Sequence, residues 1–481
     1  MRKPLRRTIF YGFTVIFIVT TPFLILYALG YSLDLAKRSL TATGGFFVKT
    51  NATGIKIYVN GILQKETNFL SHGAMVNGIV PGPAAVQIVK DGFYPWRKSI
   101  EINEQLIQEF RSILLIPETL PGRLVFGTTT PATAGNVPQK IIPSPDDALL
   151  ALAAKEKTRM VIHIIDAASG REIRMPLIFG INADIADIAW NNGGSSLMVK
   201  KVERGATSWE ILPAAERSSV SLVDSKTSIP VFDGNKKITT LTRSIIQEVS
   251  WSPRSSDEFY LKAGNDLYLW DFSQNRAKKI LENVHSFAVL GNNIFFATEN
   301  GFLAESDLDG KSSISLDRPG AFIAEKPFQF LKNAEGQRAV IDSAGGLYLE
   351  NTNTKKFVTI NGGVAKARFA ENADTLAYVK GSTINQILLA DETKQPFRKK
   401  YEKAVILDAV TPINDFIWFS KDSMHLIFTT ENGAFIAEND PRFGANATTL
   451  KTGKFLIAGS PASPDRFYLT DGQTLEEITI Q

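Results

Sequence analysis

The stretch Val249-Ser250-Trp251-Ser252-Pro253, followed by Phe259-Tyr260-Leu261, sets the pattern for most of this 481-residue chain. An apolar segment precedes a polar turn, and an apolar strand follows the turn. The same order recurs from these starting points: Ile141, Ile188, Val249, Phe287, Phe330, Phe369, Ile417 and Ile457. The spacings run from roughly 38 to 61 residues, centred in the low forties, which is typical of four-stranded propeller blades with their period of about 40–50 residues.

This repeat has a consequence for the two ends of the array. A single unit cannot bury both of its faces, so neighbouring units must stack and the array must close into a ring. We therefore expect a strand near 124–126 or 149–152 to pair with a strand near 467–469 or 476–480. Seven or eight blades are both open, because one copy can be half of a blade that the other terminus completes.

The tryptophans of the long C-terminal part follow the repeat. Trp190, Trp251 and Trp418 stand at the same phase, directly before the polar turn, and Trp270 closes the apolar run that begins at Leu267. A large aromatic side chain at a fixed phase is typical of a core position. The sequence therefore predicts that these four tryptophans pack in the propeller core.

Short motifs in these copies resemble a known superfamily. Ser144-Pro145-Asp146-Asp147 and Ser463-Pro464-Asp465 resemble the Ser-Pro-Asp-Gly turn of TolB-like blades, and Trp270-Asp271 resembles the ending of a WD40 strand. The chain departs from that pattern in its irregular spacing, its single Trp-Asp and its lack of a Gly-His dipeptide. The resemblance is to a degenerate WD40/TolB-like β-propeller, and it implies an architecture rather than a subfamily.

Residues 44–118 alternate with period two instead, which is typical of strands. The turn signals are Asn60-Gly61, Pro81-Gly82 and Asp91-Gly92, and the last of them opens the run Gly92-Phe93-Tyr94-Pro95-Trp96. Asn-Gly after an apolar run predicts a hairpin, because both residues tolerate positive φ.

These residues, about 44–104, resemble the PEGA domain family, although Asn51-Ala52-Thr53-Gly54 replaces the four-letter signature. The resemblance implies a surface β-sandwich without known catalysis, and it implies no ligand. Phe93 and Trp96 are expected to close the small core. An exposed aromatic platform for a sugar is the alternative.

The N-terminus carries an apolar run, Ile9 to Leu29, of 21 residues without a charge. About 20 apolar residues in a helix cross the hydrocarbon core of a bilayer. We expect a transmembrane helix, with these residues facing lipid: Ile9, Phe10, Val15, Phe17, Leu24, Leu26 and Leu29. A cleaved signal peptide and a buried soluble helix are the alternatives, but a signal peptide has a shorter apolar region and a small-x-small cleavage site.

Charge gives the expected topology. Arg2, Lys3, Arg6 and Arg7 precede the apolar run, and the remaining 49 Lys and Arg residues balance 49 Asp and Glu residues. By the positive-inside rule, the N-terminal tail stays in the cytoplasm and the bulk of the chain is exported. The near-neutral remainder argues against a nucleic-acid partner, which would require a basic surface.

Residues for chemistry are sparse. The chain has no cysteine and four scattered histidines, which excludes disulfides and thiolate sites and leaves no paired spacing for a metal. Asp307-Leu308-Asp309-Gly310 is interpreted as a tight turn rather than a calcium loop, and Asp184 and Asp187 as solvated rather than catalytic. We expect no catalytic residues, no cofactor and no metal site.

The predicted chain is mainly β: a cytoplasmic tail (1–8), a transmembrane helix (9–29), a linker (30–43), a PEGA-like β-sandwich (44–118) and a seven- or eight-bladed propeller (119–481). The expected function is binding or scaffolding at the outer face of a cell membrane, with the lipid bilayer and an envelope protein or glycan as partners. The alternatives are a propeller enzyme acting on cell-surface polysaccharide and a TolB-like accessory of an envelope transport machine.

Overall fold

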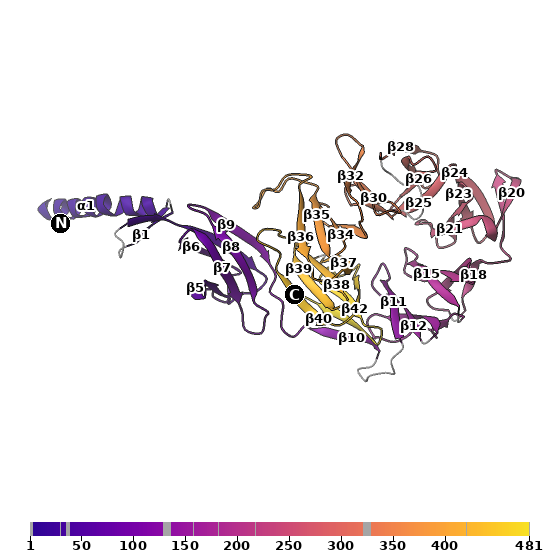
Figure 1. The fold of residues 1–481 in the computed structure, drawn as a ribbon, viewed down its shortest axis with the longest axis horizontal. Helices are drawn as coiled ribbons and strands as arrows, with labels where there is room; N and C mark the ends of the chain where they lie inside the picture. The colour runs from indigo at the N-terminus through magenta and orange to yellow at the C-terminus, as the bar shows by residue number, and fades with distance from the viewer. Residues whose placement is uncertain are drawn as a thin grey trace.

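The computed structural model describes residues 3–28, 30–34, 39–127, 136–156, 158–180, 182–216, 218–320, 329–419 and 421–480. The described chain is mainly β, with one long N-terminal helix that stands apart from the body of the molecule (Figure 1). A small two-sheet domain follows the helix, and a ring of β-sheets follows that domain.

Helix α1 (Lys3–Ala28) packs against almost nothing. Its stretch Arg7–Leu26 has a mean hydropathy of 2.2, and none of it is buried within the protein. The hydroxyls of Thr14 and Thr20 each donate to the carbonyl one turn earlier, at 2.9 and 2.8 Å. These bonds satisfy the Thr14 and Thr20 hydroxyls within the helix, as a lipid environment favours.

The segment expected to be a linker contains a short hairpin. Strand β1 (Tyr31–Asp34) pairs antiparallel with β2 (Ser39–Ala42). The backbone amide of Thr43 then donates to the carbonyl of Gly30 at 2.7 Å, and Gln105 donates to Thr43 at 2.9 Å. The hairpin therefore hydrogen-bonds to the two-sheet domain that follows it.

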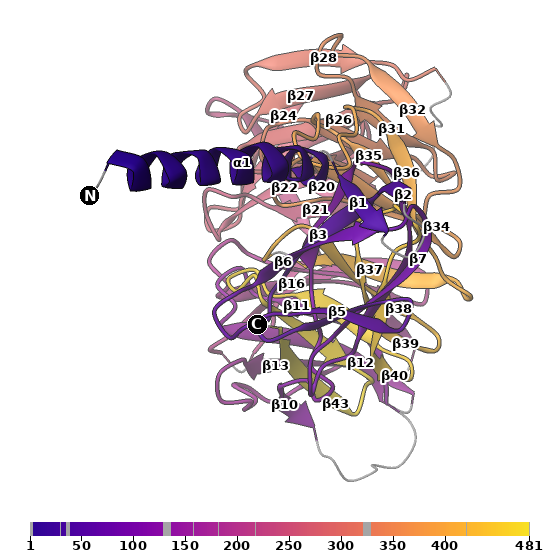
Figure 2. The ribbon, with the colours of Figure 1, turned by 90° about the vertical axis from the view of Figure 1, so that its left-hand side faces the viewer.

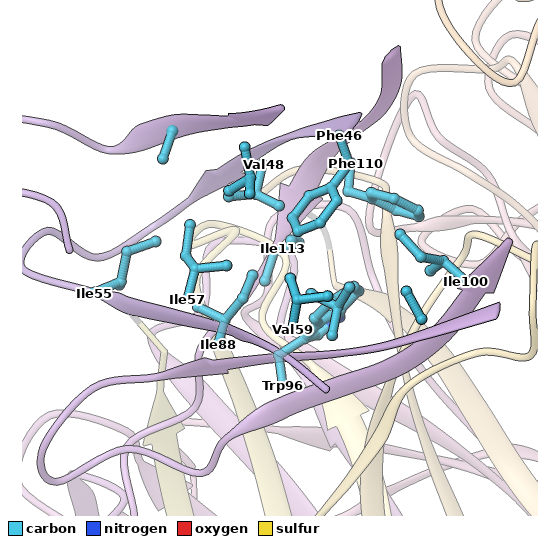
Figure 3. Packing of buried hydrophobic residues seen from close by; sticks show 14 of the residues in the cluster. Phe46, Val48, Ile55, Ile57, Val59, Ile88, Trp96, Ile100, Phe110 and Ile113 are labelled. Atoms are coloured by element: carbon cyan, nitrogen blue, oxygen red, sulfur yellow. The ribbon is translucent and has the colours of Figure 1, made fainter. Parts of the chain in front are cut away.

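Two sheets make up the next domain, which we call the two-sheet domain (residues 44–118). One sheet has the order β5-β4-β7-β8 and the other β6-β3-β9. The strands are β3 (Gly44–Thr50), β4 (Lys56–Val59), β5 (Ile62–Glu66), β6 (Gly73–Ile79), β7 (Gly82–Val89), β8 (Trp96–Ile102) and β9 (Ile107–Ile113). Both sheets contribute to one apolar core, in which Phe46, Ile57 and Trp96 are almost fully buried (Figure 3).

The predicted Asn-Gly hairpin is confirmed. Strands β4 and β5 pair antiparallel on either side of Asn60 and Gly61, whose φ angles are 49° and 79°. Two successive positive φ values are those of a type I′ turn, which matches the twist of the strands it joins. The Asn60 side chain also accepts a hydrogen bond from the amide of Ala85 at 2.9 Å, so the turn is tied to β7.

The remaining strands form a β-propeller, in which eight sheets are counted among the described residues. Blades one to three are β11 (Asn136–Pro143), β12 (Leu149–Glu156), β13 (Arg159–Asp166), β14 (Leu177–Ile178); β15 (Ala183–Trp190), β16 (Ser196–Glu203), β17 (Ala206–Pro213), β18 (Val220–Val223); and β21 (Ile246–Trp251), β22 (Glu258–Ala263), β23 (Asp266–Asp271), β24 (Arg276–Leu281). Blades four to six are β25 (Val284–Leu290), β26 (Asn293–Thr298), β27 (Leu303–Asp307), β28 (Ser313–Asp317); β29 (Gln329–Lys332), β30 (Arg338–Ile341), β31 (Leu347–Glu350), β32 (Phe357–Asn361); and β33 (Lys366–Phe369), β34 (Thr375–Lys380), β35 (Thr383–Leu388), β36 (Lys403–Asp408). Blades seven and eight are β37 (Ile413–Phe419), β38 (His425–Thr430), β39 (Gly433–Glu438), β40 (Ala447–Thr452); and β41 (Leu456–Gly459), β42 (Arg466–Thr470), β43 (Thr474–Thr479) with β10 (Gly122–Gly127). All eight repeat starts found in the sequence lie on the first strand of a blade.

The long spacing between the copies at Ile188 and Val249 has a structural cause. A hairpin of β19 (Ser228–Asp233) and β20 (Lys236–Thr242) is inserted between blades two and three. Strand β19 pairs parallel with β24, so the hairpin extends blade three outward to six strands. The insertion lengthens the repeat without disturbing the first strand of either blade.

The predicted closure of the ring is confirmed. Strand β10 pairs antiparallel with β43, with Leu124 opposite Glu476, so the first propeller strand completes the last blade. The first strands β11 and β41 contact each other across this seam. On the same seam, the Tyr468 hydroxyl donates to Asp147 Oδ1 at 2.9 Å. The colours in Figure 1 accordingly run round a ring whose two ends meet.

Candidate binding site between the two domains

The two-sheet domain rests against the rim of the propeller, beside blades six and seven, and Figure 2 shows it in front of the ring. Trp96 of β8 donates its indole N–H to Glu438 Oε2 of β39 at 3.0 Å. Lys98, two residues further along β8, forms an ion pair with the other oxygen of Glu438. The Lys98 and Glu438 side chains are 1% and 8% exposed, so this contact is desolvated and fixes the junction between the domains.

Strand β9 makes the second contact. It is an edge strand, hydrogen-bonded to β3 on one side only. On the other side of β9, the side-chain amide of Gln395 accepts from Glu109 N at 3.0 Å and donates to Ile107 O at 2.8 Å. Arg442 Nη2 donates to Glu109 O at 2.8 Å. Side chains of the propeller therefore occupy the first part of this free edge.

A cleft of about 270 Å³ opens beside these contacts, which we call the interdomain cleft. Residues of β9 form one wall, and loops that follow β35 and β39 form the other. The lining residues are Lys49, Glu109, Phe110, Arg111, Ser112, Ile113, Glu392, Lys394, Gln395, Pro396, Arg398, Met424, Glu438, Asn439, Asp440 and Arg442. Ligand sites are commonly found at domain interfaces such as this one.

Every lining carboxylate has a cationic partner. Glu109 pairs with Arg111 at 2.6 Å, Glu392 with Arg398 at 2.7 Å, Asp440 with Arg442 at 2.5 Å, and Glu438 with Lys98. Within the described part of the chain, Lys49 and Lys394 form no ion pair. The lining therefore carries an excess of positive charge.

The pKa values of two of these carboxyl groups follow from their partners. The hydrogen bond from Arg111 holds the pKa of Glu109 below its ordinary value. Burial raises the pKa of Asp440, but the hydrogen bond from Arg442 and the positive charges of Lys98 and Arg442 outweigh burial and lower it. Both carboxylates therefore stay ionised and keep their cations engaged at neutral pH.

Two buried polar atoms in the cleft have no hydrogen-bond partner among the described residues: Arg398 Nη1 and Asn439 Oδ1. The Arg398 side chain is 10% exposed, and Asn439 is 7% exposed. A buried donor or acceptor left unpaired costs about 1–3 kcal/mol. Both atoms are closed off from solvent, so they lie beneath the surface of the cleft wall.

The first strands of the blades carry further charges near the centre of the ring. Lys140 of β11 pairs with Asp187 of β15 at 2.7 Å. Lys366 and Arg368 of β33 pair with Asp415 of β37 at 2.7 and 3.5 Å. These ion pairs join neighbouring blades, and they hold Asp187 and Asp415 beside cations.

The predicted anchor residues that the structure describes lie on α1, where Ile9, Phe10, Val15, Phe17 and Leu24 are exposed. Leu26 is half-buried and Arg7 is exposed. Leu29 and Arg2 lie outside the described residues, and Lys3 and Arg6 are described only as part of the helix backbone.

The residues of the PEGA-like motif lie in turns and in the domain core. Pro81 directly precedes β7, which begins at Gly82, and Gly92 has a φ of 78° before β8. Phe93 is half-buried beneath Lys90, and Trp96 is 2% exposed. An exposed tryptophan platform for a sugar is therefore not formed here.

The four propeller tryptophans are all buried, and three of them join neighbouring blades. Trp190 Nε1 donates to Ile142 O at 2.9 Å, Trp251 Nε1 to Ala189 O at 3.1 Å, and Trp418 Nε1 to Arg368 O at 3.1 Å. Each acceptor lies on the first strand of the preceding blade. Trp270 is 2% exposed within blade three, and its Nε1 has no partner among the described residues.

The turn at Asp307–Gly310 is held by an ion pair. Asp309 accepts from Arg254 of the neighbouring blade at 2.6 Å, and Asp307 accepts from backbone amides of its own turn. Over the described ranges, no group of three or more His, Asp or Glu side chains is arranged to hold a metal ion.

The sequence analysis did not identify the residues of the junction, Lys98, Gln395, Glu438 and Arg442. Only Lys98 carried a signal. It stands in the inward phase of β8, with Trp96, Ile100 and Ile102, and all four are buried. A lysine in the apolar phase of a strand indicates a buried cation that needs a partner from elsewhere.

No protein-family model matches this chain, and no curated protein matches it. Among solved structures, it is similar to Hsv2 from Kluyveromyces lactis, at 12% identity and a TM-score of 0.40, over 66% of this chain and 99% of that one. It is similar to YCF48 from Cyanidioschyzon merolae, at 10% identity and a TM-score of 0.39, over 74% of this chain and 98% of that one. It is also similar to the computationally designed Ika8 protein, at 8% identity and a TM-score of 0.44, over 74% of this chain and 100% of that one. These are β-propeller-type proteins. Likenesses this distant give no indication of ligand or activity, and the propeller assignment rests on the sheet order of this chain.

Proposed function

We propose that this chain is a membrane-anchored binding or scaffold protein of the cell envelope, which presents a PEGA-like module and a β-propeller outside the cytoplasm for interaction with a protein or glycan. The observation that carries the proposal is α1, whose 20-residue apolar stretch Arg7–Leu26 is unburied. A contiguous apolar surface of this size is stable in water only when something apolar covers it. A bilayer covers it along its whole length.

Binding, rather than catalysis, is supported by the arrangement of the charges. Asp187 and Asp415 on the first strands are each engaged by a cation on the neighbouring blade. A glycan hydrolase needs two carboxyl groups facing one substrate bond, one of them with a raised pKa. The interdomain cleft, with its free β-strand edge and its positively charged lining, is suited instead to holding a ligand.

The PEGA-like assignment belongs to the same proposal. It is supported by the Asn60-Gly61 hairpin and by the run from Gly92 to Trp96. Trp96 is the first residue of β8, the strand that contacts the propeller. A module of this kind between a membrane helix and a propeller would hold the propeller at a fixed place above the bilayer.

Fractionation of cells that express the full chain tests the anchor. The chain should sediment with membranes at its full mass, and protease added to intact spheroplasts should degrade everything after about residue 40. The double variant Val15→Arg, Phe17→Arg should lose membrane retention, since each charge at the helix centre costs about 2.5–3.5 kcal/mol. The control Ile314→Arg adds a charge at an exposed propeller position and should behave as the original chain.

The outcomes separate the alternatives. A shorter mature chain in the soluble fraction would identify a cleaved signal peptide, and protection of the propeller from protease would overturn the topology. Turnover of envelope polysaccharide by the purified chain, abolished by replacing a propeller acid, would replace binding with catalysis.

A further inference from the structure

We propose that the interdomain cleft binds an extended, carboxylate-bearing peptide segment of a partner protein, which pairs with the free edge of β9. The inference rests on the proposed binding function and names the class of ligand. It follows from the backbone edge of β9 on one wall and from the positive charge of the lining.

The edge of β9 is already occupied in part, in the way that a peptide would occupy it. The side-chain amide of Gln395 accepts from Glu109 N and donates to Ile107 O, as the C=O and N–H of one residue in an added strand would. The side of β9 away from β3 is its outer edge, and the strand carries an extra residue between Phe110 and Ile113, where Arg111 lies. No described strand pairs with that side of β9, and Arg111 lines the cleft. The next position on the edge is therefore open to a ligand.

An extended segment placed in the cleft would present its own N–H and C=O groups to the open part of the β9 edge. Addition of a strand to an exposed sheet edge is a common mode of peptide recognition.

The charge of the cleft favours an acidic segment. The lining carboxylates are already paired, whereas Lys49 and Lys394 form no ion pair with a described residue. A ligand carboxylate placed near Lys394 would therefore gain attraction without displacing an existing ion pair.

A glycan is disfavoured by the same surface. Phe110 is the aromatic residue among those that line the cleft, and it is 4% exposed. Its ring is covered by Arg442, whose guanidinium carbon lies 4.7 Å from the ring centre. The cleft therefore offers no exposed ring on which a sugar could stack.

Binding of synthetic peptides to the full chain in detergent micelles tests the proposal. The probe is a fluorescent pool of acetylated hexapeptides with one fixed glutamate and mixed β-branched residues elsewhere. We expect the pool to bind and to slow hydrogen exchange of the Arg111 amide. The same pool with glutamine in place of glutamate, and a pool N-methylated at alternate residues, should each bind about tenfold more weakly or worse.

Two lysines of one loop provide a matched pair of variants. Lys394 lines the cleft without a partner, whereas Lys399 pairs with Asp391 at 3.2 Å and does not line it. Lys394→Glu should weaken binding of the acidic pool at least about fivefold, and Lys399→Glu should leave it unchanged. Both positions are exposed, so neither change should alter the melting temperature.

Absence of binding by the acidic pool, or equal binding by the N-methylated pool, would overturn the inference. If a chitin tetrasaccharide protects the Arg111 amide and the peptides do not, the ligand is a glycan. In that case the inference fails while the proposed binding function stands. Membrane fractionation does not depend on either result.

Discussion

Three tryptophans each connect two blades of the propeller through a single hydrogen bond. Trp190, Trp251 and Trp418 donate their indole N–H groups to a carbonyl on the first strand of the preceding blade. A tryptophan can do this because its apolar ring fills the space between two sheets while its one polar atom reaches the edge of the neighbouring strand. The recurrence of these residues therefore reflects the joint between blades as well as the filling of the core.

The two tryptophans of blade three allow the hydrogen bond to be separated from the packing. Trp251→Phe removes the donor to Ala189 O, whereas Trp270→Phe removes an N–H that has no partner among the described residues. We expect Trp251→Phe to cost about 0.5–1.5 kcal/mol more than Trp270→Phe, the net contribution of one hydrogen bond. Trp251→Ala should cost about 3–5 kcal/mol, because it also leaves a cavity.

Urea unfolding of the full chain in detergent, followed by tryptophan fluorescence and circular dichroism, measures these differences. Equal costs for the two phenylalanine variants would mean that the indole hydrogen bond between blades contributes no net stability.

At the scale of elements, strand β43 has a role that no other described strand of its blade has. It pairs with β42 on one side and with β10 on the other, and so joins the last part of the chain to the first propeller strand. Its residues Leu475 and Ile478, and Ile480 after it, are fully buried in the cores on either side of the seam. The ring is therefore closed by one strand.

Deletion of residues 467–481 should destabilise the whole propeller. Loss of the buried Leu475, Ile478 and Ile480 side chains alone removes about 5–9 kcal/mol, at about 1.5–3 kcal/mol each. A domain has about 5–15 kcal/mol of stability in total. Calorimetry should show the propeller transition lowered or lost, whereas deletion of residues 1–43 should leave it in place. A truncated chain that melts cooperatively at the original temperature would refute closure and favour an open array.

At the scale of the whole molecule, the position of the two-sheet domain depends on a buried ion pair. Lys98 reaches Glu438 from β8, and Glu438 also accepts from Trp96 and from the amide of Asn446 at 2.9 Å. A charge that loses its buried partner is costly, because the desolvation remains and the attraction is gone. This pair therefore sets the relative position of the two domains, and with it the shape of the interdomain cleft.

Lys98→Met should cost about 3–5 kcal/mol, because it leaves Glu438 buried and charged. The double variant Lys98→Met, Glu438→Gln should recover most of that loss, since glutamine can still accept from Trp96 without carrying a charge. The control Lys279→Met breaks partly exposed pairs with Glu282 and Asp266 and should cost no more than about 1 kcal/mol. Limited proteolysis between residues 114 and 122, together with unfolding midpoints, reports the separation of the domains. No recovery in the double variant would show that the charge is not what holds the junction.

The repeat, the apolar helix and the Asn-Gly hairpin were predictable because each depends on residues close in the sequence. An apolar segment before a polar turn marks the first strand of a blade wherever it occurs, and a charge-free run of 21 residues has the length of a bilayer span. Closure at β10 and β43 was also predictable, since stacked sheets must cover both end faces.

The interdomain cleft and the joints between blades were decided by the tertiary structure alone. Gln395 and Glu109 are 286 residues apart in the sequence, and Trp96 and Glu438 are 342 residues apart. No local sequence pattern includes both members of either pair. Their meeting depends on where the closed ring places its sixth and seventh blades beside β8 and β9. Local sequence determines which segments become strands and which side chains they turn inward. The whole chain contributes the surfaces that are buried on folding, and their burial decides which strands lie side by side. That burial places Lys98, which stands in the apolar phase of β8, next to Glu438.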